Sequence, residues 1–88
     1  MNNNSTKINE AKLAEWIGVY EAKLVEAMTN YPADYGYPVS KAPEVAQKMR
    51  AAIINQSYSK DGRAIKATCK HFGIPYTYTA INSFLQSV

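Results

Sequence analysis

The stretch SKDGRAIKATCKHFGIPYTYTAINSFLQSV, residues 59–88, decides the fold class of this 88-residue chain. In its first half the apolar residues Ile65, Cys69 and Phe72 are spaced by four and then three positions. This spacing places them on one face of a helix. We expect that helix to begin near Gly62, directly after a turn.

Both ends of this helix carry sequence signals. Ser59 or Asp61 can cap its first amides with a side-chain oxygen. At the other end, Gly73 occupies the position where a left-handed residue closes a helix, and Ile74 can fold back onto the last turn. Pro75 cannot continue a helix, because it lacks an amide hydrogen and its ring clashes with the preceding turn. The sequence therefore predicts a firm stop at Gly73.

A second short helix is predicted directly after this stop. Thr77 or Thr79 can cap it. Its apolar residues then repeat at helical spacing: Ala80, Ile81, Phe84, Leu85 and Val88. Residues 59–88 should therefore form a helical hairpin or a helix-turn-helix.

The preceding residues predict two further helices joined by an irregular loop. A long helix is expected over residues 7–30, where apolar residues form a continuous stripe: Leu13, Ile17, Tyr20, Leu24, Ala27 and Tyr31, widened by Trp16, Val25 and Met28. Residues 31–43 contain three prolines and a glycine, which exclude a regular helix. From Pro43 to about Gln56 or Ser57 the pattern is again helical, with an apolar face made of Val45, Met49, Ala52 and Ile53.

These elements define the fold class as all-α, a small bundle of about four helices with one long N-terminal helix and a C-terminal helical hairpin. The length suffices for one domain with a modest core. We assign residues 7–88 to this single helical domain and residues 1–6, MNNNST, to a flexible polar tail. No stretch approaches the roughly 18 apolar residues of a membrane span, and no signal peptide is evident. We therefore expect a soluble cytoplasmic protein that does not bind membranes.

Charge is unevenly divided along the chain, although the total is only +3. Residues 1–40 carry three lysines against five acidic residues, a net charge of −2. Residues 41–88 carry seven lysines and arginines against two acidic residues, a net charge of +5. This division favours an anionic partner for the second half, or contact between opposite halves of two copies.

Nucleic-acid binding is the function that the basic second half favours. Arg63, Lys66 and Lys70 are spaced by three and four positions, so they share one helical face and can reach phosphates. Lys60 lies at the entry of that helix. Residues at the start of the next helix could contact base edges: Tyr76, Thr77 and Tyr78. We predict that these seven residues bind nucleic acid, DNA rather than RNA. The alternative is that the basic face is only the solvated side of an amphipathic helix.

A different surface supports a second hypothesis, a protein partner. Tyr31, Tyr35 and Tyr37 lie in the loop, and aromatic-rich loops make good contact surfaces. The same tyrosines could instead pack the loop onto the long helix. A third hypothesis is a homodimer paired through the apolar stripe of the long helix, from Leu13 to Tyr31.

Residues able to carry out catalysis or bind metal are sparse. Cys69 and His71 are the single cysteine and the single histidine, and two positions apart on a helix they do not face each other. Cys69 lies on the apolar face, which favours a small buried side chain over a nucleophile or a zinc ligand. Glycine-rich phosphate-binding motifs are absent from the sequence. We therefore predict no enzymatic activity, no metal and no cofactor.

Two resemblances add to these inferences. Residues 67–85, ATCKHFGIPYTYTAINSFL, look like a helix-turn-helix, in which Ala67, Gly73 and Ile81 resemble the small, turn and apolar positions. Together with residues 35–53, YGYPVSKAPEVAQKMRAAI, the segment is similar to small proteins encoded by tailed bacteriophages and prophages. That resemblance implies an early phage protein in the bacterial host cytoplasm. Such a protein would bind DNA or modulate a host protein, such as a polymerase, a nuclease or a defence factor.

Overall fold

The computed structural model describes residues 8–86, and no strand occurs in this range. Its α-helices are α1 Glu10–Asn30, α2 Ala42–Ile54, α3 Arg63–Phe72 and α4 Tyr78–Gln86. Two short 3-10 helices, η2 Pro32–Asp34 and η3 Val39–Lys41, lie between α1 and α2. The all-α prediction of a small bundle with one long N-terminal helix is confirmed. The predicted tail, residues 1–6, lies outside the described residues.

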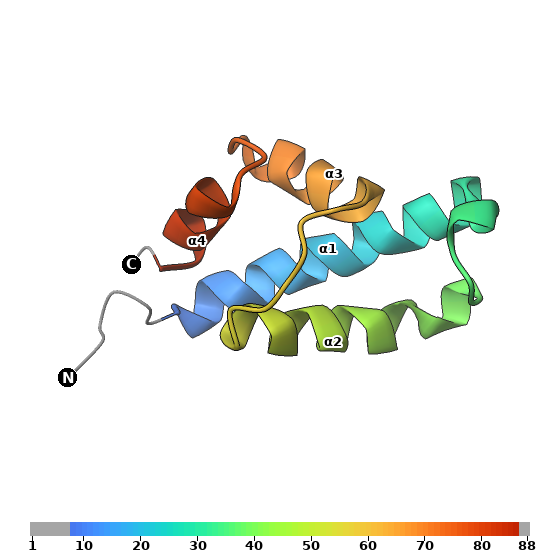
Figure 1. The fold of residues 1–88 in the computed structure, drawn as a ribbon, viewed down its shortest axis with the longest axis horizontal. Helices are drawn as coiled ribbons and strands as arrows, with labels where there is room; N and C mark the ends of the chain where they lie inside the picture. The colour runs from blue at the N-terminus through green and yellow to red at the C-terminus, as the bar shows by residue number, and fades with distance from the viewer. Residues whose placement is uncertain (1–7, 87–88) are drawn as a thin grey trace.

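The long helix α1 lies at the centre of the bundle, and the other three α-helices pack against it (Figure 1). In Figure 1, α2 runs antiparallel to α1 on one side, whereas α3 and α4 lie on the other. The linker of residues 55–62 passes across α1 to connect α2 with α3. The molecule is elongated, measuring 44 × 23 × 19 Å. None of the described helices is both long enough and apolar enough to span a bilayer.

The predicted apolar stripe of α1 forms the core of the bundle. Its buried members are all at most 7% exposed: Leu13, Ile17, Tyr20, Leu24 and Ala27. The prediction that Tyr31 and Val25 belong to the buried stripe is wrong, since Tyr31 is 47% exposed and Val25 is 37% exposed. Tyr31 follows the last residue of α1, and Val25 lies at the edge of the covered arc. The stripe is thus covered within one chain, and a homodimer through it would have to displace α2 or α3.

The start of α1 is fixed by polar contacts. Asn9 caps the helix, because its Oδ1 accepts hydrogen bonds from the N–H groups of Ala11 at 2.9 Å and Lys12 at 3.1 Å. The N–H of Asn9 donates to the carbonyl oxygen of Leu85 in α4 at 2.8 Å. The helix therefore begins at Glu10, three residues later than predicted, and its first turn is tied to α4.

The stop of α3 has the predicted form. Gly73 adopts a left-handed conformation with φ 68°. The N–H of Gly73 donates to the carbonyl oxygen of Lys70 at 3.1 Å, and that of Ile74 donates to the carbonyl oxygen of Cys69 at 3.0 Å. These two bonds make a Schellman motif, which closes the helix and turns the chain toward α4.

The N-terminal ends of α3 and α4 are formed differently. Thr77 caps α4, since its Oγ1 accepts a hydrogen bond from the N–H of Ala80 at 3.1 Å, which confirms one of two predicted caps. Neither Ser59 nor Asp61 caps α3, so that prediction is wrong. Ser59 Oγ instead accepts a hydrogen bond from the N–H of Asp61 at 3.2 Å, and the N-cap residue is Gly62. Ser59 closes a turn of the linker before α3 begins.

The buried face of α2 is shifted toward smaller residues than predicted. Ile53 is buried as expected, whereas the other predicted core residues are only half-buried: Val45, Met49 and Ala52. Ala42 and Ala46 are fully buried. Because alanine carries a single methyl group, these two positions allow the backbone of α2 to approach its neighbours closely.

Candidate nucleic-acid interface

An aromatic cluster fixes α1, α3 and α4 relative to one another. The ring of Trp16 in α1 stacks on that of Phe72 in α3, with centroids 5.8 Å apart. Phe84 in α4 lies 4.7 Å from Phe72 and 6.1 Å from Trp16. Since each helix contributes one ring, the cluster determines which face of α3 is turned toward solvent.

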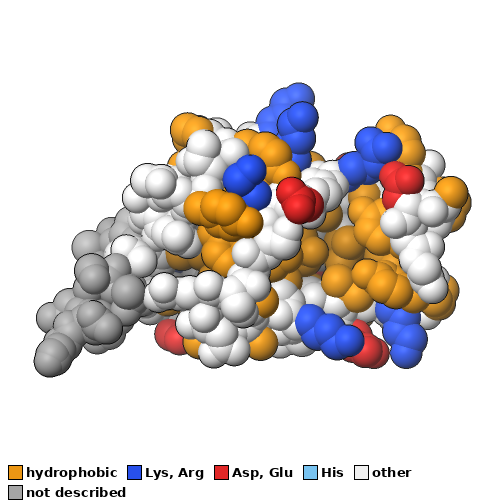
Figure 2. All heavy atoms as spheres, viewed as in Figure 1, with side chains coloured by type: hydrophobic (Ala, Val, Ile, Leu, Met, Phe, Trp, Pro, Cys, Tyr) orange, Lys and Arg blue, Asp and Glu red, His pale blue; other side chains and the backbone are white. Residues whose placement is uncertain are grey.

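The solvent-facing side of α3 borders a hollow of about 560 Å³. We call it the basic groove, and its lining residues are Tyr31, Arg63, Lys66, Ala67, Cys69, Lys70, Ile74 and Tyr76. Lysine and arginine side chains project from the edge of the molecule formed by α3, at the top of the view in Figure 2. The groove therefore combines cationic side chains with aromatic and aliphatic ones.

Lys66 and Lys70 are two of the three exposed cations that line the basic groove, the third being Arg63. No carboxylate of residues 8–86 forms an ion pair with either of them. They lie four positions apart on α3, so they are neighbours on the helix surface. Both ammonium groups are consequently available to adjacent phosphates of one strand.

Arg63 is held by two contacts with the segment that follows α1. Its Nε donates to Oδ2 of Asp34 at 3.0 Å, and its guanidinium carbon lies 3.7 Å from the centroid of the Tyr31 ring. Both side chains of the ion pair are 52% exposed. An exposed pair of this kind contributes at most about 1 kcal/mol. A phosphate can therefore compete with Asp34 for Arg63 at small cost.

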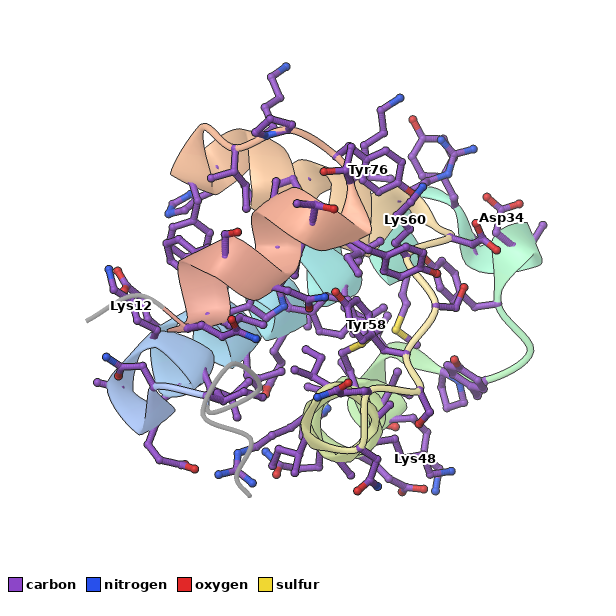
Figure 3. All side chains as sticks on the ribbon, turned by 60° about the vertical axis from the view of Figure 1, so that its left-hand side comes forward. Lys12, Asp34, Lys48, Tyr58, Lys60 and Tyr76 are labelled. Atoms are coloured by element: carbon purple, nitrogen blue, oxygen red, sulfur yellow. The ribbon has the colours of Figure 1, made fainter. Side chains whose placement is uncertain are left out.

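Several other predicted residues fasten the linker to α4 (Figure 3). Lys60 Nζ lies 4.5 Å from the ring centroid of Tyr76 and 5.5 Å from that of Tyr78. The N–H of Lys60 donates to the Tyr78 hydroxyl at 3.3 Å, and the Tyr76 hydroxyl donates to the Lys60 carbonyl. Tyr58 packs edge-on against Tyr78, with centroids 5.3 Å apart, and donates to Oδ1 of Asn82 at 2.9 Å. We call Tyr58, Lys60, Tyr76 and Tyr78 the linker clasp.

Burial raises the pKa of several tyrosine and cysteine side chains in this region, which strengthens their ordinary preference for the neutral form at physiological pH. Burial, together with the nearby Tyr78 and Cys69, raises the pKa of Tyr58 to about 12. Burial also raises the pKa of Tyr76. The pKa of the Cys69 thiol is raised by burial, although Lys60 acts in the opposite direction. These groups therefore place no negative charge beside the basic groove.

The structure divides the predicted nucleic-acid-binding set. The basic groove brings together Arg63, Lys66, Lys70 and Tyr76. Lys60 and Tyr78 lie in the linker clasp, and Thr77 caps α4. Sequence reasoning did not identify Tyr31 as a lining residue of this groove. It also did not identify Asp34 as the partner of Arg63, because the two residues are 29 positions apart in the sequence. Local spacing carries no signal for a contact of that range.

The three loop tyrosines occupy different environments. Tyr31 lines the basic groove. Tyr35 packs against the core and lies 6.3 Å from Tyr37, centroid to centroid. Tyr37 is 43% exposed. The loop is therefore packed through Tyr35 and leaves Tyr37 at the surface.

The remaining reactive residues do not form a site with one another. Cys69 is 1% exposed, which confirms the prediction that it is buried. His71 is exposed on α3, and its ring lies edge-on to Phe72 at 4.9 Å. Within residues 8–86, no group of three or more histidine, cysteine or acidic side chains could hold a metal ion.

Comparison with known proteins yields no relative for this fold and groove: no protein-family model, curated protein or solved structure matches the chain. The helix-turn-helix likeness and the similarity to phage proteins therefore stay predictions. The chemistry of the basic groove is the feature of this chain that points to a function.

Proposed function

We propose that this protein binds nucleic acid, with DNA favoured over RNA, through the basic groove. The observation that carries the proposal is the combination of two lysines without described ion-pair partners, one weakly paired arginine and two tyrosine rings around one hollow. Cationic side chains attract phosphates, and aromatic side chains accept bases by stacking. Both kinds of contact are thus supplied by one surface.

The basic face of α3 is the proposed principal contact, in preference to α4. In a helix-turn-helix the second helix would enter the major groove and present its N-terminal residues to base edges. However, α4 contains no lysine or arginine. At its start, Thr77 Oγ1 is engaged in capping and the Tyr78 hydroxyl accepts a hydrogen bond from the linker. The positive charge lies instead on α3, at Arg63, Lys66 and Lys70.

Replacing Lys66 and Lys70 together by glutamine tests the proposal. We expect weaker binding to labelled oligonucleotides in fluorescence anisotropy, measured at about 50 and 200 mM salt. The salt slope should fall by about 1.4–1.8, because each lost phosphate contact removes about 0.7 for a single strand or about 0.9 for a duplex.

The matched control replaces Lys41 and Lys48 by glutamine. Both are exposed and belong to the η3–α2 segment, where they pair with Glu44, so the control loses the same net charge elsewhere. Retained binding in the control supports a local site on α3. Equal losses in the two double variants would mean that only net charge matters, and absence of binding by the wild-type protein would refute the proposal.

A protein partner is the second candidate function. It is favoured by the exposed side chains of Tyr37 and Val39, which are 43% and 36% exposed in the segment between α1 and α2. Under this proposal the chain would be a phage-encoded protein that binds and modulates a host protein without catalysis. The contact surface would then be the loop that carries Tyr31, Tyr35 and Tyr37. Replacing Lys66 and Lys70 by glutamine would leave the interaction intact.

A further inference from the structure

We infer that the basic groove receives an unstacked nucleobase, so that the preferred ligand is a single strand and not an intact duplex. The inference rests on the proposed function and adds the form of nucleic acid that the site selects. It starts from the apolar part of the groove, which phosphate contact alone does not require.

The groove offers flat and apolar surfaces below its cationic rim. Ala67 and Ile74 are half-buried and line it from α3 and from the turn after it. Tyr31 and Tyr76 contribute aromatic rings from two other segments of the chain, and each ring carries a cation, Arg63 or Lys60, over one of its two faces. Nucleobases stack on such rings irrespective of their identity, because every base has a π-face. These side chains therefore suit a base better than a phosphate.

The size of the hollow agrees with this occupant. A closed cavity of about 150 Å³ is enough to hold benzene. The basic groove, with about 560 Å³, has room for a base together with its sugar. Lys66, Ala67 and Lys70 lie close together along α3. One nucleotide can therefore place its phosphate against the lysines and its base in the hollow beside Ala67.

A duplex cannot fill the groove in this way without being disrupted. Its bases are paired and stacked, so a base would have to be flipped out at the cost of its pairing and stacking free energy. A single strand already presents bases that can be splayed out onto aromatic side chains. The duplex is thus limited to phosphate contacts with the rim, while the single strand gains both kinds of contact.

The test compares three labelled ligands of equal length with the full chain by fluorescence anisotropy. They are a mixed-sequence DNA strand, the duplex of the same sequence, and an abasic strand that keeps the phosphates but lacks the bases. We expect the single strand to bind about tenfold or more tighter than the abasic strand and the duplex. The abasic strand isolates the contribution of the bases.

A groove-filling variant, Ala67→Leu, locates the base-binding surface. We expect it to reduce single-strand binding to the level of the abasic strand, while abasic and duplex binding persist because Lys66 and Lys70 remain. The control is Ala51→Leu at an exposed position of α2, which should change nothing. If circular dichroism shows that Ala67→Leu is unfolded, Tyr31→Ala removes a groove wall at an exposed ring and should show the same selective loss.

The outcomes separate this inference from the proposed function. Equal binding of all three ligands, insensitive to Ala67→Leu, would overturn the inference and leave phosphate binding by α3 intact. Absence of binding to any of them would overturn both. Binding of an acidic peptide in the groove with no binding of DNA would also overturn both and assign the groove to a protein partner.

Discussion

Arg63 lies between an acidic and an aromatic side chain, and the two make different contributions to its position. Asp34 neutralises the guanidinium through the contact at 3.0 Å. The Tyr31 ring, 3.7 Å from the guanidinium carbon, supports it from a flat face without removing its charge. Removing the carboxylate would therefore leave Arg63 positioned at the groove but available to a ligand.

The variant Asp34→Asn should bind nucleic acid about two- to fivefold more tightly than the wild type, because an exposed ion pair of up to about 1 kcal/mol no longer competes for Arg63. Anisotropy titration at low salt measures the change. The control Glu44→Gln removes the same charge from α2, where Glu44 pairs with Lys41 and Lys48. An equal gain in both variants would contradict a specific role for Asp34.

Two glycines, one at a helix end and one in the middle of a helix, differ in whether the backbone requires a glycine. Gly73 holds the left-handed position that closes α3, with φ 68°. Gly18 lies in the middle of α1 and is exposed. A Cβ atom added at either position would meet no atom within 4 Å. The two sites therefore differ in backbone conformation and not in available space, and Gly18 serves no close approach to another helix.

Substituting alanine at these two glycines should have opposite effects on stability. Gly73→Ala should lower the free energy of unfolding by about 1–2 kcal/mol, because a side chain disfavours the left-handed conformation. Gly18→Ala should raise it by about 0.5–1 kcal/mol through better helix propensity. Urea denaturation followed by circular dichroism measures both. A Gly73→Ala variant as stable as the wild type would contradict the role assigned to the Schellman motif.

Elements governed by local signals were the predictable ones. The stop at Gly73 depends on residues adjacent in sequence, and the stripe of α1 depends on helical periodicity alone. The start of α3 near Gly62 agrees with the prediction, whereas its predicted cap by Ser59 or Asp61 is wrong because distant contacts order the linker. The Tyr76 hydroxyl bonds the Lys60 carbonyl, and Tyr78 accepts from the Lys60 N–H at 3.3 Å. Short-range capping rules do not describe such contacts.

At the scale of the whole molecule, the aromatic cluster holds α1, α3 and α4 together and so sets the orientation of the basic groove. Trp16 is completely buried, and its indole N–H has no hydrogen-bond partner among the described residues. Its contribution is therefore ring packing against Phe72 and Phe84. Spacing alone predicted that three cations share a face of α3. The groove could not be predicted, because the fold must bring Tyr31 to α3 to line it, with Asp34 placed beside Arg63.

The stability of the whole molecule should fall at alkaline pH. Burial, with smaller contributions from Tyr35 and Tyr37, raises the pKa of Tyr20 from an ordinary value of 10.0 to about 12. Burial is also the main cause that raises the pKa of Tyr58 to about 12. Between pH 10 and about pH 12, these two tyrosines have lost their protons in the unfolded chain but keep them in the native state. This stabilisation is thus fully present below pH 10 and is lost as the pH rises through 12.

Urea denaturation at about pH 9 and about pH 11 should therefore show a lower midpoint at the higher pH. The variant Tyr58→Phe should show a smaller decrease than the wild type, because it cannot ionise at that position. Absorbance of tyrosinate in the near ultraviolet should report that Tyr20 and Tyr58 ionise last, at about pH 12. Identical midpoints at the two pH values would contradict the assignment.

The hydrogen bond between Asn9 and Leu85 has a consequence for how the chain folds during its synthesis. A ribosome releases α1 first, with its apolar stripe still uncovered. The partners that cover this stripe lie in α2 and α3, and the bond that ties down its first turn comes from α4, near residue 85. Native closure must therefore wait until α4 has left the exit tunnel. During translation, the nascent stripe is the segment that a chaperone would recognise.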